Sequence, residues 1–181
     1  MTLLNVGQPI GGIIQIAYTV PDIEKAVRSY AQDLKLGPWF LRGPLQARKP
    51  VYRGNPQKLE LSIAIAYSGH VMIELIQQHD EQPSVYRELI DRQGYGFHHW
   101  GIASDRFDDD LRGYAERGFE LVFTDETPVE NPRCLFGREA RLARVHRAYR
   151  NQRCLRAALR KNVCRRTFVG WCGSHPESLI K

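Results

Sequence analysis

The stretch Gly94-Tyr95-Gly96-Phe97-His98-His99-Trp100-Gly101-Ile102-Ala103 decides the fold, because it begins a strand-forming run with two adjacent histidines. Neighbours on a strand point to opposite faces, so only one histidine is expected to face a given site. When Gln15 is aligned with His99, similar residues in two parts of the chain match at a constant offset of 84 residues. The matched pairs are Val27 with Leu111, Arg28 with Arg112, Tyr30 with Tyr114 and Ala31 with Ala115. The chain therefore reads as two related halves, with Gln15 and His99 at equivalent places.

The first half is predicted to run strand, helix and three further strands. Residues 13–20 predict a strand, and Asp22 is a candidate cap or first-turn acid for the helix that follows. Gly37-Pro38 ends this helix, residues 39–41 predict a short strand, and residues 42–58 predict an exposed loop. Two strands over residues 59–67 and 70–77 are joined by a hairpin turn at Ser68-Gly69.

The second half repeats this order only in part. Residues 83–92 predict a connecting helix that ends before Gly94. A strand over 99–103, a helix over 107–117 and a strand over 119–123 follow, but the later residue pattern does not supply the last two strands. The predicted units are a first βαβββ module (1–82), a connecting helix (83–95), the start of a second module (96–131), an Arg-rich segment (132–170) and a tail (171–181). The predicted fold class is α+β, with the second module incomplete or altered after about residue 131.

Composition excludes several classes of protein. The chain has 181 residues, of which 43% are hydrophobic, enough for a substantial core in one domain or two small repeats that share one. No apolar run approaches the roughly 20 residues that a membrane span requires. Residues 1–12 lack a basic segment followed by a hydrophobic core, so we expect no secretion signal and a cytoplasmic location.

The net charge of +6 is concentrated in one segment. Residues 133–166 contain 12 of the 26 Lys and Arg residues and one of the 20 acidic residues, Glu139, so they carry +11 and the remainder carries −5. All four cysteines, at 134, 154, 164 and 172, lie in the same C-terminal part. They lack the spacing of a metal site and are interpreted as incidental thiols or as products of an altered reading frame.

An arginine recurs at every third position from Arg138 to Arg156. This spacing matches neither the period of a helix nor that of a strand, so it distributes charge around all sides of either element. One interpretation is a basic arm that binds nucleic acid through phosphate. Few aromatic residues and no recognisable reader motif accompany the arginines, so nucleic acid is the less favoured partner.

A second interpretation is that this segment is read one nucleotide out of frame. Shifting ordinary codons for Leu142 through Asn151 by one base permits Trp-Pro-Gly-Phe-Ile-Glu-Leu-Ile-Glu, which resembles residues 71–76 of the first half. The same shift over residues 133–137 permits Gly-Ala-Tyr-Leu-Asp, which reads as a preceding strand. We favour this hypothesis because the shifted sequence supplies the two missing strands.

The paired halves, the run QIAYTVPD that begins at Gln15, the strand MIEL and the strand GFHHWGIA together resemble the vicinal oxygen chelate superfamily. This superfamily includes glyoxalase I, methylmalonyl-CoA epimerase and extradiol dioxygenases. The resemblance covers about residues 13–125, and it rests on the ordered set of motifs rather than on any single one. It implies paired βαβββ modules that form a cupped mixed sheet around a divalent metal ion.

The resemblance also implies the ligands of that ion. Carried over position by position, they are Gln15, Glu74 and His99, with a fourth from the second half's counterpart of Glu74. That counterpart falls near Arg147, where this chain has a cation in place of a carboxylate. An arginine beside the metal repels it, so we expect weak or no metal binding for the chain as written.

This donor set agrees with a borderline divalent ion such as Ni, Co, Zn or Mn, with positions left for water or substrate. Such an ion polarises adjacent oxygens and stabilises the enolate formed when a proton is removed next to a carbonyl. Glu74, at the metal's edge, is the candidate base. Gln15 in the first place resembles the isomerase and epimerase branch rather than the dioxygenases, whose iron site uses two histidines and one carboxylate. The expected activity is a lyase or epimerase acting on a small oxygenated substrate such as a thioester.

Simpler interpretations remain open for each residue. Gln15 is compatible with a partly exposed strand glutamine, and Glu74 with alternation on a half-exposed strand. His98 reads as a supporting or packing residue, and His70 and His79 as turn and loop residues. The chain as a whole is also compatible with a metal-free binding protein resembling the bleomycin-resistance proteins. Exposed sheet edges make a homodimer a further expectation.

Overall fold

The computed structural model describes residues 11–104, 106–126, 132–138, 142–149 and 168–169. The three helices in this part are α1 (Ile23–Asp33), α2 (Val85–Gln93) and α3 (Phe107–Glu116). The strands are β1 (Ile13–Thr19), β2 (Trp39–Gln46), β3 (Arg48–Tyr52), β4 (Asn55–Pro56), β5 (Glu60–Ser68), β6 (Val71–Gln78), β7 (Gly96–Ala103), β8 (Glu120–Glu126), β9 (Pro132–Arg138), β10 (Leu142–Tyr149) and β11 (Phe168–Val169). The predicted α+β class is confirmed.

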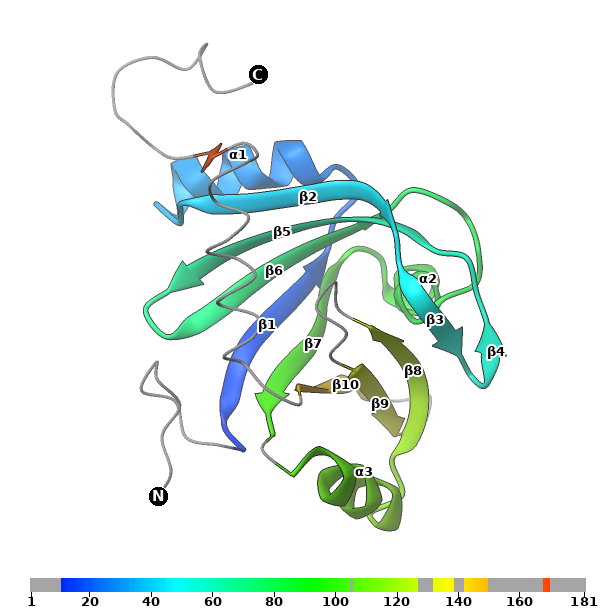
Figure 1. The fold of residues 1–181 in the computed structure, drawn as a ribbon. Helices are drawn as coiled ribbons and strands as arrows, with labels where there is room; N and C mark the ends of the chain where they lie inside the picture. The colour runs from blue at the N-terminus through cyan, green and yellow to red at the C-terminus, as the bar shows by residue number, and fades with distance from the viewer. Residues whose placement is uncertain (1–10, 105, 127–131, 139–141, 150–167, 170–181) are drawn as a thin grey trace.

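Two modules with the same strand order are joined into one sheet. The order across the sheet is β11-β2-β5-β6-β1-β7-β10-β9-β8-β3-β4 (Figure 1). Within the first module β1 pairs in parallel with β6, and within the second β7 pairs in parallel with β10. The modules meet where β1 and β7 run antiparallel to each other. The predicted pairing of two βαβββ modules in a mixed sheet is therefore present.

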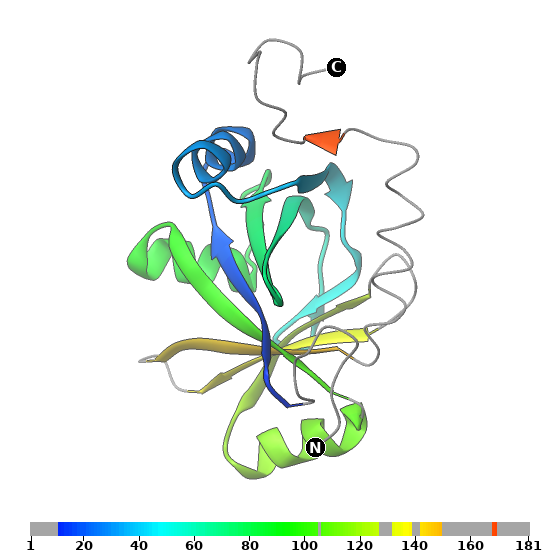
Figure 2. The same ribbon diagram turned by 90° about the vertical axis from the view of Figure 1, so that its left-hand side faces the viewer.

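The equivalent helices lie at opposite ends of the molecule. Figure 2 shows α1 above the first module and α3 below the second, with the strands of the two modules running in different directions. The first turns of α1 bury Ile23 and Val27, which are four residues apart on one helical face, in a cluster with Trp39 and Leu75. The counterpart α3 buries Phe107 in a cluster with Phe136. Each helix thus covers its own module.

Local sequence signals explain where two of the helices begin. The side chain of Asp22 accepts a hydrogen bond of 2.9 Å from the backbone N–H of Lys25, so its predicted role as the cap of α1 is confirmed. Ser84 caps α2 in the same way, by accepting from the backbone N–H groups of Tyr86 and Arg87. The cap places α2 between the modules, where Val85 and Tyr86 join a buried cluster that contains Phe123 and Leu135 of the second module.

The predicted exposed loop over residues 42–58 was wrong. In the structure β2 continues to Gln46, and β3 and β4 follow directly. These residues become strands because β3 pairs antiparallel with β8 of the other module, for example Val51 with Thr124. Because β8 is far from β3 in the sequence, local residue preferences do not reveal this pairing. In this stretch they indicated a loop.

The expectation that the residues after 131 supply no further strands was also wrong. β9 pairs with β8, and β10 lies between β9 and β7, so the second module has the strand order of the first. Backbone ladders on both sides hold β9 and β10 extended despite the threefold spacing of arginine. The frame hypothesis and the boundaries of the Arg-rich segment stay predictions, and residues 150–167 lie outside the described part of the chain.

None of the helices in the described part of the chain combines the length and the apolar character that crossing a membrane requires.

Candidate metal centre

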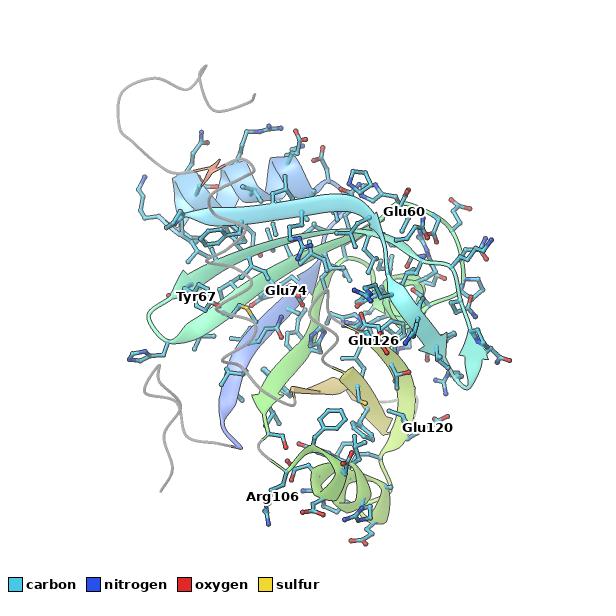
Figure 3. The ribbon with its side chains drawn as sticks, in the orientation of Figure 1. Glu60, Tyr67, Glu74, Arg106, Glu120 and Glu126 are labelled. Carbon is cyan, nitrogen blue, oxygen red and sulfur yellow. The ribbon has the colours of Figure 1, made fainter. Side chains whose placement is uncertain are left out.

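Glu74 and His99 approach each other across the strand that separates them. Glu74 on β6 and His99 on β7 both pair with Ala17 of β1, so the three residues lie side by side on one face of the sheet. The small Ala17 side chain, which is fully buried, leaves room for the two larger ones to meet above it. Oε2 of Glu74 lies 3.8 Å from Nε2 of His99. Figure 3 shows Glu74 near the middle of the molecule, whereas Arg106 and Glu120 lie at its outside.

Gln15 lies on the same face of the sheet, two residues before Ala17 on β1. Its backbone partners are Met72, two residues before Glu74, and Gly101, two residues after His99. Gln15 has no exposed surface, and Glu74 is only 2% exposed. The alternative interpretation of both as half-exposed strand residues was therefore wrong. The sequence-predicted trio comes from three adjacent strands and is buried.

Arg147 occupies the backbone position of the expected fourth ligand. It pairs with Gly101 on β7, just as Glu74 pairs with Ala17 on β1. Ala17 and Gly101 are themselves separated by the 84-residue offset of the repeat. The register thus places an arginine where the symmetry of the modules calls for a second carboxylate.

His98 and His99 contact each other because β7 is irregular at this point. Ala17 pairs with His99 and the next residue, Tyr18, pairs with Phe97, so His98 is the extra residue of a bulge. Both histidines are fully buried, and their Nδ1 atoms lie 2.8 Å apart. Nε2 of His98 lies 3.1 Å from the carbonyl oxygen of Val85 in α2. The bulge therefore allows two adjacent side chains to touch, whereas on a regular strand they would point to opposite faces.

The comparisons with known proteins place this geometry in a family. The model of the glyoxalase/bleomycin resistance protein/dioxygenase superfamily matches residues 14–136, which include all three candidate ligands and most of both modules. The chain belongs to this superfamily. The predicted resemblance to vicinal oxygen chelate proteins is thereby confirmed. None of the curated protein sequences compared with the chain matches it.

Solved structures share the fold of this chain at low sequence identity. A hypothetical protein from Bacillus halodurans is 18% identical, with a TM-score of 0.59, over 76% of this chain and 92% of its own. Methylmalonyl-CoA epimerase from Mycobacterium tuberculosis is 15% identical, with a TM-score of 0.57, over 77% and 87% of the two chains. A Streptomyces coelicolor methylmalonyl-CoA epimerase variant in complex with 2-nitronate-propionyl-CoA is 12% identical, with a TM-score of 0.57, over 78% and 94%. At these identities the likeness shows the fold alone.

The donor chemistry of the three residues suits a divalent ion of the kind that superfamily members use. Imidazole nitrogens and carboxylate oxygens contact ions such as Zn²⁺ at about 2.0–2.2 Å, so two atoms 3.8 Å apart can reach one ion between them. Among the described residues, no three His, Cys, Asp or Glu side chains are arranged so that they could hold one metal ion by themselves. The third protein donor of such a site would be the amide oxygen of Gln15, which leaves other positions for water or substrate.

The remaining histidines and the described cysteine lie elsewhere. His70 lies with Gly69 in the turn between β5 and β6, one residue later than the predicted turn at Ser68-Gly69. His79 follows β6, and its Nε2 lies 2.6 Å from Oγ of Ser62. Cys134 on β9 is buried against α3, and burial raises the pKa of its thiol to about 12. Cys154, Cys164 and Cys172 lie outside the described residues.

One buried acid was missed by sequence reasoning. Asp125 on β8 is 4% exposed and follows Phe123 by two residues, so both point to the same face of the sheet. Phe123 belongs to the buried cluster that contains Ala17. The run Leu121-Val122-Phe123-Thr124-Asp125 shows no regular alternation of apolar and polar residues, and an acidic residue near a strand end reads as exposed, so no clear signal of this burial was present in the sequence.

Proposed function

We propose that this chain is a glyoxalase- or epimerase-like protein that binds a divalent metal ion and removes a proton next to a carbonyl of a small oxygenated substrate. The observation that carries the proposal is the buried approach of Glu74 and His99, with Gln15 beside them on the strand between. Membership of the superfamily supports the choice of reaction. The proposed role of this site is to bring one carboxylate, one imidazole and one amide to a single cation.

Each residue has a distinct part in this proposal. His99 and Gln15 hold the ion through nitrogen and amide oxygen, and Glu74 both approaches the ion and is the candidate base. When bound, the ion supplies Lewis acidity that stabilises the enolate oxygen of the substrate. Burial excludes water from these side chains, which strengthens every electrostatic interaction among them. The proton removed from the substrate carbon would move to a carboxylate oxygen of Glu74.

Thioesters are the first substrates to test, because several structures of similar fold are methylmalonyl-CoA epimerases. The experiment follows exchange of the proton next to the carbonyl in ²H₂O, with 2-branched acyl-CoA esters and added Zn²⁺, Mn²⁺, Co²⁺ or Ni²⁺. We expect slow exchange that needs the metal and is lost in Glu74→Gln and His99→Gln. Glu24→Gln, which changes an exposed acid on α1, is the matched control and should exchange as the parent does. Exchange that is unaffected by the Glu74 and His99 substitutions would refute the proposal.

A second candidate function is metal-free binding of a small molecule. The backbone register that puts Arg147 at the fourth ligand position favours it, because an arginine near the site opposes a divalent cation. Elemental analysis of the purified protein separates the two candidates. Stoichiometric metal indicates the enzyme, whereas ligand binding with no metal and no effect of a chelator indicates the binding protein.

Two copies of the chain are expected to pair. The edge strands of the described sheet are the short strands β4 and β11, and edge strands are the places where another chain can extend a sheet. Light scattering after size-exclusion chromatography tests this expectation, and a monomeric mass at all concentrations would contradict it.

A further inference from the structure

His98 is held between the candidate ligand His99 and the connecting helix α2. Its ring packs at a tilt against that of Tyr86 in α2, with centroids 4.9 Å apart and an angle of 36° between the planes. Its two ring nitrogens face different partners, Nδ1 of His99 at 2.8 Å and the carbonyl oxygen of Val85 at 3.1 Å. Because His98 has no exposed surface, these contacts fix the orientation of its ring.

These hydrogen-bond partners determine which ring nitrogen of each histidine carries a proton. A carbonyl oxygen only accepts hydrogen bonds, so Nε2 of His98 must carry its proton and donate to Val85. Neutral His98 then has an unprotonated Nδ1, which accepts the hydrogen bond that Nδ1–H of His99 donates. Neutral His99 consequently has its lone pair on Nε2, the atom that faces Glu74 at 3.8 Å.

The resulting arrangement suits a cation between His99 and Glu74. An imidazole lone pair directed at a carboxylate oxygen is repulsive when nothing lies between them, whereas a positive ion at that place attracts both. Metal-binding histidines generally donate their second ring N–H to a fixed acceptor, which sets the tautomer and the ring orientation. Here the acceptor is a second histidine that is itself fixed by the backbone of α2.

We propose that His98 is a positioning residue that fixes His99 in the tautomer with an unprotonated Nε2. The bulge in β7 brings the two rings into contact and so makes this positioning possible. The role in metal binding rests on the proposed function, whereas the tautomer does not. Long-range ¹H–¹⁵N correlation spectra of the metal-free protein observe it directly, with His99→Gln used to assign the signals. We expect a protonated Nδ1 and an unprotonated Nε2 for His99, and the reverse for His98. A protonated Nε2 on His99 would overturn the proposal, whether or not metal binds.

Two substitutions of His98 test its effect on affinity. His98→Leu removes the acceptor for His99 Nδ1–H, and we expect the dissociation constant for Zn²⁺ to rise roughly 10–100-fold. His98→Asn places an amide oxygen near the former Nδ1, so it should keep most of the affinity and the His99 tautomer. The thermal unfolding temperature of each variant shows whether it is folded. Equal Zn²⁺ affinity in the parent and both folded variants would refute the positioning role. If the parent binds no Zn²⁺ while its spectra show the expected tautomers, the proposed function fails and the assignment of the rings stands.

Discussion

Glu74 and Arg147 hold equivalent backbone positions in the two modules, because Glu74 pairs with Ala17 and Arg147 with Gly101, the residue that the repeat matches to Ala17. The two modules therefore have an acidic residue and a basic residue at equivalent backbone positions. In the proposed metal centre, a basic residue at this position is expected to weaken the binding of a cation, and an acidic residue is expected to strengthen it. The equivalence is a property of the backbone ladders and needs no assumption about the reaction.

Arg147→Glu is expected to strengthen binding of a divalent ion. At an effective dielectric constant of 20, two unit charges 4 Å apart interact by about 4 kcal/mol, and about 1.4 kcal/mol changes a dissociation constant tenfold. We therefore expect at least a roughly tenfold tighter dissociation constant for Mn²⁺ or Zn²⁺ by calorimetric titration. Arg144→Glu makes the same change of charge on β10 but away from the register position, so it should have a much smaller effect. Equal gains in both variants would attribute the effect to net charge alone.

The frame hypothesis predicts a specific defect in the gene. Sequencing the DNA between the codons for Glu130 and Gly173 should reveal an insertion or deletion near the start of the Arg-rich segment and a second change near its end. Restoring the frame should then return a carboxylate at or near position 147. An intact frame in this stretch, with no nearby insertion or deletion, would end the hypothesis.

Tyr52→Phe tests the polar cluster that joins β3 to α2. The Tyr52 hydroxyl donates to Glu88 at 2.6 Å, and Arg53 donates to both Glu88 and Glu120. Burial disfavours the Glu88 carboxylate, but the hydrogen bonds from Tyr52 and Arg53 outweigh it and hold its pKa below the ordinary 4.5. Because the folded-state pKa is lowered, the stabilisation is present above pH 4.5 and is lost as the pH falls through the folded-state value.

We therefore expect Tyr52→Phe to lower the free energy of unfolding by about 1 kcal/mol at pH 7, since the cluster is partly exposed, and by less at pH 3. Urea unfolding at the two pH values measures both quantities. Tyr95→Phe, at a half-exposed tyrosine outside the cluster, is the control and should change neither. A loss that is the same at pH 7 and pH 3 would mean that the hydroxyl does not act through the charge of Glu88.

Cys134 is expected to resist alkylation in the folded protein. Its thiol is buried, and a pKa of about 12 leaves almost no thiolate at pH 8. Peptide mass spectrometry after iodoacetamide treatment should show Cys134 unmodified without denaturant and modified in urea. Rapid modification of Cys134 in the native protein would show that β9 is accessible from solvent.

The internal repeat made much of the fold predictable. The 84-residue offset correctly matched β1 with β7 and α1 with α3, and Asp22 correctly marked the start of α1. These are local signals of period and capping, which survive in a single sequence. The match of Arg147 to Glu74 came instead from the shifted reading of residues 142–151, because the 84-residue offset alone would lead to position 158. The backbone register agrees with position 147.

Other features depend on contacts that no local pattern records. β3 is a strand because β8 lies beside it, and β9 and β10 are strands because the ladder extends through them. The bulge at His98 was likewise hidden, since strict alternation separates adjacent side chains. The only sequence signal for the bulge is the pair of adjacent histidines. This pair led to the prediction of one site residue and one supporting residue, but not of the contact between them.

The most direct test of the metal centre is calorimetric titration of Arg147→Glu with Zn²⁺ and Mn²⁺, beside the same variant carrying Glu74→Gln. The proposed centre of Gln15, Glu74 and His99 predicts one saturable site in the first protein and roughly a tenfold or greater loss of affinity in the second. Absence of a site in the first protein, or equal affinity in the two, would contradict it.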